Sequence, residues 1–197
     1  ACLGMVFASM GKMSEAYHLG VVATKMAQKM NHQGCDAMTS TVVHAFLNYL
    51  KQPMHASIDP LRLAHQSAMA SGDIEGALYS AITFINLIRD AGRNLEFVTS
   101  ETQRVAELIR DYSSTHMSTP QLLMMILPQW QFALNITGKA RDPLKLTGTA
   151  MEEDTFVAEC IDEHIVRGMK QLYDAKMKLG YYFGDIKIAF EASKNLR

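Results

Sequence analysis

A short phrase occurs three times in this chain, each time where one apolar helix-like stretch gives way to the next. The copies are MGKMSEAY (10–17), SGDIEGALY (71–79) and FGDIKIAF (183–190). In each copy a glycine is followed five residues later by an alanine. A glycine just past a helix can adopt the left-handed conformation that ends the helix without steric cost. The alanine lets two helix backbones approach each other closely.

These glycine and alanine positions are therefore predicted to be structural, repeat-packing positions. They are Gly11 with Ala16, Gly72 with Ala77, and Gly184 with Ala189. A recurring helix–glycine–helix unit is typical of α-helical repeats, which stack unit on unit and present an extended surface. The phrase thus predicts an architecture and says little about chemistry.

Apolar residues at helical spacing predict about nine helices and no sheet. The expected ranges are 1–10, 16–30, 36–50, 59–72, 75–91, 96–112, 121–136, 154–182 (one helix or two) and 186–196. Ser14, Asp59 and Asp142 are expected to cap helix N-termini, the last two directly before a proline. Met26, Phe46 and Ile161 are expected on inward stripes, and a break is expected near Gly168.

The predicted fold class is therefore all-α, a TPR-like α-solenoid of stacked antiparallel helix pairs. Residues 1–197 are expected to form a single helical-repeat region, with sub-units of about 1–58, 59–118 and 119–197. The chain opens without an initiator methionine and ends within a helical pattern. We therefore expect it to be a fragment of a longer polypeptide.

Composition disfavours two classes of partner. The formal net charge is −1, and no basic cluster exceeds two residues, so a nucleic-acid footprint is not expected. The most apolar run, Leu122–Leu127, is far shorter than the roughly 20 residues that span a bilayer, so no membrane partner is expected. Three widely spaced cysteines (Cys2, Cys35, Cys160) favour buried thiols and a cytoplasmic location.

No motif for catalysis or cofactor binding is recognisable. The sequence lacks a GxxxxGK[ST] phosphate loop, and its two Gly-Lys pairs lack the second glycine. His32 and Cys35 have a spacing that a metal could use, but two further ligands would have to come from elsewhere. Glu159, Asp162 and Glu163 are best explained as a solvated helix face. We therefore expect no cofactor, no metal and no catalytic residue in this segment.

Methionines and aromatic residues offer the only candidates for a binding surface. Most of the 14 methionines lie on predicted inward stripes, where they would fill the core. Met124 and Met125, close to Trp130, are the exceptions and are expected to form an interface. Tyr181, Tyr182 and Phe183 directly precede Gly184 and are expected to pack against the next repeat.

Two segments resemble the helical-repeat region of a large family of multidomain "predicted ATPase" signalling proteins. They are GDIEGALYSAITFINLIRDAGRNLEFV (72–98) and LPQWQFALNITGKARDPLKLTG (127–148), followed by the closing unit YYFGDIKIAFEASKNL (181–196). Members of that family join a Ser/Thr-kinase-like domain, a STAND-type AAA ATPase, helical repeats, a GAF domain and often a sensor histidine kinase. The repeats depart from the roughly 34-residue tetratricopeptide, because Gly11, Gly72 and Gly184 lie 61 and 112 residues apart.

The resemblance implies a non-catalytic scaffold or regulatory segment that mediates protein interactions within a multidomain signalling ATPase or kinase. The expected partner is a protein, either an adjacent domain of the same chain or another molecule. Two alternatives stay open. One is a free-standing peptide-binding adaptor, and the other is a helical small-molecule sensor with a pocket between repeats.

Overall fold

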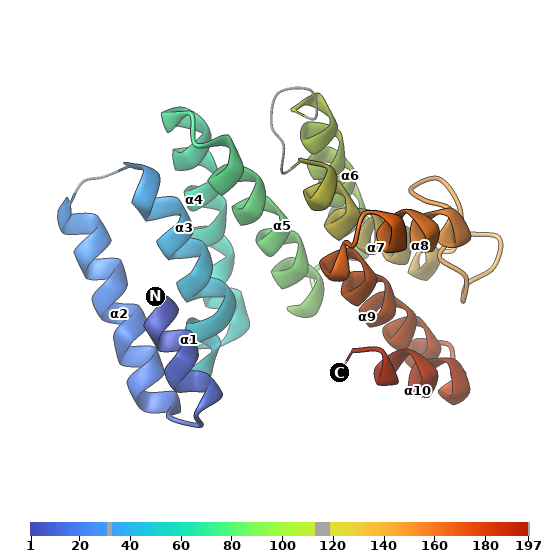
Figure 1. Ribbon diagram of the computed structural model, residues 1–197, viewed down its shortest axis with the longest axis horizontal. Coiled ribbons are helices and arrows are strands. Elements are labelled where there is room, and N and C mark those ends of the chain that lie inside the picture. The colour runs from blue at the N-terminus through green and yellow to red at the C-terminus, as the bar shows by residue number, and fades with distance from the viewer. Residues whose placement is uncertain (31–32, 113–118, 197) are drawn as a thin grey trace. The chain divides into compact units, whose positions relative to one another are not determined.

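The computed structural model describes residues 1–30, 33–112 and 119–196, and within these ranges it contains ten α-helices and no β-strand (Figure 1). The predicted all-α class is confirmed. The contacts divide the chain into two compact units, Ala1–Gly92 and Arg93–Arg197. The division at Gly92 coincides with neither of the sub-unit boundaries expected near residues 58 and 118.

The first unit contains five α-helices and three short helical turns. The α-helices are α1 (Cys2–Ser9), α2 (Met13–Met30), α3 (Gln33–Val42), α4 (Ile58–Ser71) and α5 (Ile74–Asp90). The chain continues from α3 through the π-helical turn η1 (Val43–Leu47) and the 3-10 turn η2 (Asn48–Leu50), and η3 (Met54–Ser57) leads into α4. Helix α5 is buried on most of its circumference, as its apolar sequence predicts.

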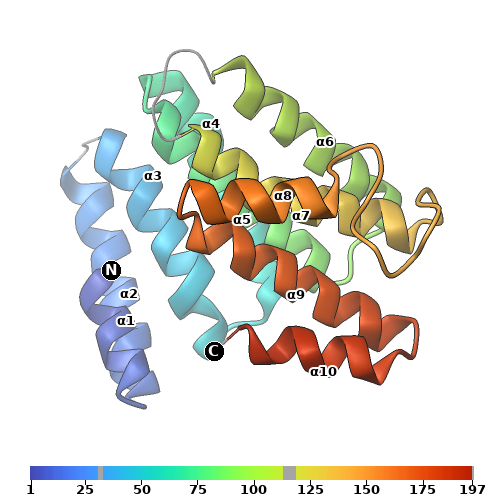
Figure 2. The ribbon, with the colours of Figure 1, turned by 45° about the vertical axis from the view of Figure 1, so that its right-hand side comes forward.

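The second unit contains the other five α-helices. These are α6 (Leu95–Asp111), α7 (Thr119–Ile136), α8 (Glu153–Asp162), α9 (Val166–Tyr182) and α10 (Ile186–Lys194). Figure 2 shows α9 and α10 lying side by side as an antiparallel pair. A core cluster formed by α7, α8, α9 and the 137–152 segment includes Phe132, Leu146, Phe156 and Leu172.

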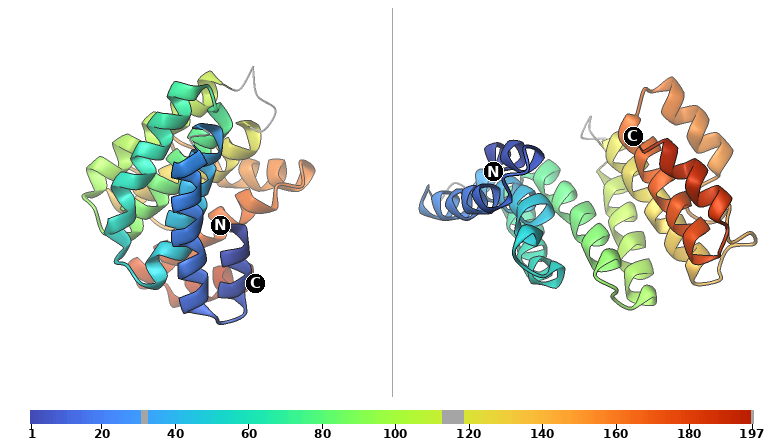
Figure 3. Two further views of the ribbon diagram at one scale, coloured as in Figure 1. Left: turned by 90° about the vertical axis from the view of Figure 1, so that its left-hand side faces the viewer. Right: turned by 90° about the horizontal axis from the view of Figure 1, so that it is seen from below.

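The three copies of the repeated phrase form three helical hairpins: α1–α2, α4–α5 and α9–α10. Figure 3 shows α1 and α2 as a tight antiparallel pair. The backbone angle φ is +77° at Gly11, +78° at Gly72 and +78° at Gly184. All three glycines therefore adopt the left-handed conformation that ends the first helix of each pair.

Several expected helix starts differ from the observed ones. Ser14 lies inside α2 rather than before it, and Asp59 lies in the first turn of α4, which begins at Ile58. The observed side-chain caps include Asp73 and Asp185, whose carboxylates accept a hydrogen bond from the backbone N–H three residues later. In two of the three hairpins the residue after the glycine therefore caps the N-terminus of the second helix.

Asp142-Pro143 does not begin a helix. The segment 137–152 is irregular and is held by buried polar side chains instead. The Asn135 amide donates to the carbonyl oxygens of Pro143 (3.1 Å) and Lys145 (2.8 Å). The Glu153 carboxylate accepts from the backbone N–H of Leu146 (2.8 Å). These side-chain contacts satisfy backbone groups that a helix would otherwise pair.

Gly168 does not interrupt a helix either, because it lies within α9. The break between α8 and α9 falls at His164, whose φ is +56°. A Cβ on Gly168 would lie 2.8 Å from Cys160 Sγ and 3.2 Å from Met124 Cβ. The glycine therefore allows α9 to pack closely on its neighbours.

Three side chains that were expected on inward stripes are exposed instead. They are Met26, Phe46 and Ile161. Phe46 lies in the π-helical turn, next to the fully buried Leu47. A helical stripe predicts a direction only relative to its own helix, and the neighbouring elements decide which direction is covered.

Candidate interaction surface on the last hairpin

The α9–α10 hairpin exposes large apolar side chains on adjoining positions. Tyr181, Tyr182, Phe183, Ile186 and Phe190, here called the α9–α10 face, are each between 45% and 71% exposed. Exposed apolar side chains that occur singly are ordinary, whereas a contiguous patch is typical of a binding surface. Tyrosine and phenylalanine are also enriched at protein interfaces.

An open groove of about 430 Å³ lies on this face. Its lining residues come from both helices: Met177, Lys178, Tyr181, Tyr182, Ile186, Ala189, Phe190 and Ser193. Lys178 is paired with Asp174 at 2.9 Å, in an i, i+4 ion pair along α9. Six of the eight lining residues are apolar or aromatic, so the groove is mainly apolar.

The aromatic rings of the face contact one another and the core. The ring centroids of Tyr181 and Tyr182 are 5.8 Å apart in an edge-to-face arrangement, and Tyr182 is 6.4 Å from the ring of Phe132. On α10, the Lys194 ammonium lies 4.5 Å from the centroid of Phe190. Aromatic pairs and cation–π contacts of this kind orient the rings. The patch is thus attached to the core of the second unit rather than to a loose tail.

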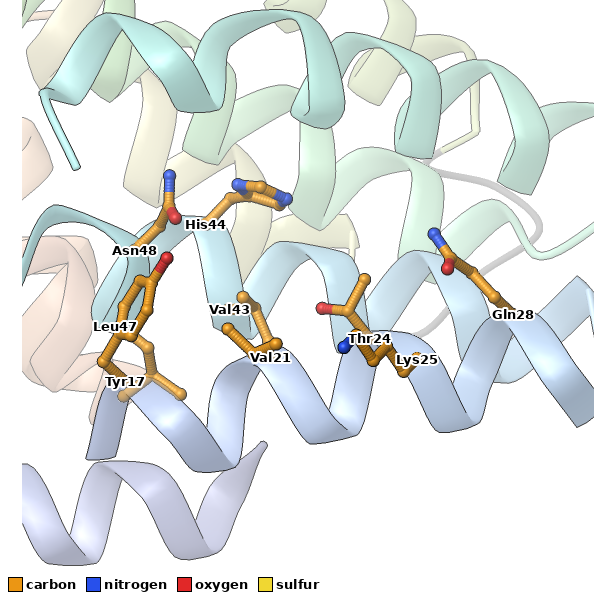
Figure 4. Close-up of a pocket in the computed structure, with 9 residues that line it drawn as sticks. All are labelled: Tyr17, Val21, Thr24, Lys25, Gln28, Val43, His44, Leu47 and Asn48. Atoms are coloured by element: carbon orange, nitrogen blue, oxygen red, sulfur yellow. The ribbon is translucent and has the colours of Figure 1, made fainter. Parts of the chain in front are cut away.

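A second groove, of about 270 Å³, lies in the first unit between α2 and the continuation of α3 (Figure 4). Tyr17 and Lys25 line it from α2, and His44 and Asn48 line it from the opposite side. The π-helical turn that holds His44 is a feature often found at functional sites.

His44 and Asn48 share one hydrogen-bond partner, the hydroxyl of Ser57. Asn48 Nδ2 donates to Ser57 Oγ at 2.8 Å, and His44 Nδ1 lies 3.1 Å from the same oxygen. Burial lowers the pKa of His44 below its usual 6.5, because the charged imidazolium loses solvation. Ser57 is 2% exposed, and it is not among the residues that line the groove. The cluster ties η1 and η2 to η3.

The repeat-packing residues predicted from sequence do not gather into one site. Ala16 and Ala77 are fully buried, each beside the first helix of its hairpin, whereas Ala189 is half-buried and lines the α9–α10 groove. Their glycine partners lie at the hairpin turns. The six positions are distributed over both units and act within separate hairpins.

The interface expected at Met124, Met125 and Trp130 is only partly accessible, because Trp130 is buried and the two methionines are half-buried. Trp130 is 5% exposed, with the Arg110 guanidinium 5.6 Å from its ring. Met124 packs against the core cluster of the second unit, and Met125 is half-buried. These residues were predicted from their side-chain types alone. The burial of Trp130 removes it from any exposed surface.

The expectation of buried thiols holds for one cysteine and is wrong for another. Cys160 is buried, and the loss of solvation raises its pKa, whereas Cys2 is exposed. His32 and the side chain of Cys35 lie outside the described residues. Among those described, no group of three or more His, Cys, Asp or Glu side chains could hold a metal ion. None of the described helices is long and apolar enough to cross a bilayer.

No protein-family model matches this chain, and neither a curated protein nor a solved structure matches it. The fold and the surface define it as an all-α protein of helical hairpins with an exposed aromatic groove. Its similarity to the signalling-ATPase family stays a prediction from the quoted sequence segments.

Proposed function

We propose that this chain is a non-catalytic, cytoplasmic helical-repeat scaffold that binds proteins through its α9–α10 face. The observation that supports the proposal is the contiguous, exposed, apolar groove lined by Tyr181, Tyr182 and Phe190. Burying such a groove gains free energy of about 25 cal/mol per Å² of apolar surface. Rigid aromatic side chains lose little conformational entropy on binding, so they are effective anchors.

The architecture proposed for this scaffold is a TPR-like α-solenoid segment of stacked antiparallel helix pairs. Three hairpins closed by left-handed glycines support it. Within a multidomain signalling ATPase, such a segment would dock one domain against another. Finding kinase-like and ATPase domains encoded in the same open reading frame as this chain would support that host, and their absence would contradict it.

Selection from a random-peptide display library, with the whole chain as bait, tests the binding role. We expect enriched peptides whose binding is lost when Tyr181 and Phe190 are both replaced by Ser. Both side chains are exposed, so circular dichroism should show an unchanged fold. The matched control replaces two exposed apolar residues of the first unit, Val22 and Leu63, by Ser.

The control variant should bind the enriched peptides as the original chain does. The proposal fails if no peptide is enriched. It also fails if the enriched peptides bind the Tyr181→Ser/Phe190→Ser variant and the original chain equally well.

A further inference from the structure

The three hairpins can be compared position by position from their glycines. Three residues before the glycine lie Ala8 in α1, Met69 in α4 and Tyr181 in α9. Five residues after it lie the alanines of the repeated phrase, one in each hairpin. In each hairpin the two positions meet in one cluster or one groove, so they mark the same side of the hairpin.

In the α4–α5 hairpin this side is covered by α3. Ala37 of α3 forms a buried cluster with Ala77, and Met69 packs against that cluster. One helical turn further along α3, Thr41 Oγ1 lies 2.7 Å from Ser80 Oγ of α5. The hairpin thus binds a helix through the positions defined above.

In the α1–α2 hairpin the equivalent side is covered by the continuation of the same helix. Val43 and Leu47 of η1 form a buried cluster with Ala16, and Ala8 packs against it. A Cβ on Gly4 would lie 2.7 Å from Leu47 Cδ1, so the leucine fills the space beside this glycine. Two hairpins therefore use the same side to hold successive parts of one helix.

In the α9–α10 hairpin the same two positions, Tyr181 and Ala189, line the open groove. Tyr181 is 71% exposed. The residue directly after the alanine is 1% exposed in α5 (Leu78), half-buried in α2 (Tyr17) and 60% exposed in α10 (Phe190). The third hairpin thus has the binding side of the other two, with the apolar surface open.

We infer that the α9–α10 groove binds an amphipathic α-helix in the register by which the other two hairpins hold α3 and η1. This inference rests on the proposed function and names the partner of the same surface. It commits to a helical segment, as opposed to an extended peptide or a second copy of this chain.

Side-chain size at the comparison position predicts the composition of that helix. In the α1–α2 hairpin, the small Ala8 packs against the cluster that contains the large Leu47. In the α4–α5 hairpin, the larger Met69 packs against the cluster that contains the small Ala37. Close packing requires such complementary volumes. Because Tyr181 is larger still, the bound helix should carry glycine or alanine opposite it, with a second small residue four positions along.

The test uses a fluorescent, helix-stabilised peptide with the sequence of residues 36–50, whose Ala37 and Thr41 provide small residues four apart. The matched peptide replaces both by Leu. We expect the first peptide to bind the whole chain, and the second to bind it more weakly by on the order of tenfold. Tyr181→Ala makes room opposite these two positions. The Tyr181→Ala variant should therefore bind the double-Leu peptide more tightly than the original peptide.

Fluorescence anisotropy gives the affinities, and amide chemical-shift changes at Gly184 and Ser193 locate the bound peptide. The inference is overturned if neither peptide binds while extended peptides from the display library do, although the proposed function then stands. It is also overturned if sedimentation shows that the chain dimerises through the α9–α10 face. If neither helical nor library peptides bind, both proposals fall.

Discussion

A Cβ placed on Gly180 would lie 2.6 Å from the backbone nitrogen of Ala189. It would also lie 2.9 Å from the carbonyl oxygen of Asp185. Both neighbours are backbone atoms, so no side-chain rotation could relieve the contact. Helices α9 and α10 therefore touch backbone to backbone at this crossing, and the geometry of the α9–α10 groove depends on it.

Gly180→Ala should destabilise the chain. Overpacking of a close contact costs about 1–3 kcal/mol, and the better helix propensity of alanine, about 1 kcal/mol, offsets only part of that cost. Urea unfolding followed by circular dichroism would measure the change. Ala68 occupies the equivalent place in α4, where alanine is already accommodated, so Ala68→Gly is the matched comparison. A more stable Gly180→Ala protein would contradict the backbone contact.

Gly184→Val should lower the free energy of unfolding by about 1–2 kcal/mol, because a β-branched residue is forced to positive φ. The local space is open, since a Cβ at this position has no neighbour within 4 Å among the described residues. The cost is thus conformational and not steric. Gly184→Asn should cost less, because asparagine tolerates the left-handed conformation. Thermal unfolding of both variants measures this, and equal midpoints would refute the assignment of the cap.

Asn135→Ala should loosen the 137–152 segment. The substitution removes an amide that donates to the carbonyl oxygens of Asp142, Pro143 and Lys145, and it leaves Gln131 without its acceptor at Asn135 Oδ1. Unpaired buried polar groups cost about 1–3 kcal/mol. Hydrogen exchange should show lost protection in 137–152 first. The exposed Thr149→Ala serves as the control and should leave exchange unchanged.

Acidification should destabilise the first unit through His44. Burial lowers the pKa of this imidazole in the folded state, so the unfolded chain binds the proton more tightly. The stabilisation is complete above the unfolded value of 6.5 and is lost as the pH falls from there towards the folded pKa.

The measurement compares urea unfolding at about pH 7.5 and about pH 5.5, on either side of the unfolded pKa of histidine. His44→Gln should show a smaller loss of stability between the two pH values than the original chain. The exposed His55→Gln should behave as the original chain does. An identical loss in all three proteins would exclude His44 as the cause.

The helices and their turns could be predicted from sequence because their determinants are local. Helical periodicity within a few turns and a glycine just past a helix are enough to predict the three hairpins, and the left-handed angles at Gly11, Gly72 and Gly184 follow from the same signal. The cap at Asp185 was missed, although an aspartate before an apolar helix is itself a recognisable signal.

The aromatic groove could be only half predicted. The sequence predicted that Tyr181, Tyr182 and Phe183 would pack against the next repeat. It predicted the interface at Met124, Met125 and Trp130 instead. Covered and exposed helices have similar apolar stripes, so a stripe does not reveal which of its faces is occupied. That distinction required the positions of neighbouring helices.

The sequence by itself determined the all-helical class and the three glycine-closed hairpins, because each depends on residues within one or two helical turns. Only the tertiary structure decided that Trp130 is buried, that Tyr181 is exposed, and that α3 and η1 occupy two hairpins while the third stays open. Burial is set by elements that lie tens of residues away along the chain, and no local sequence pattern specifies where those elements pack.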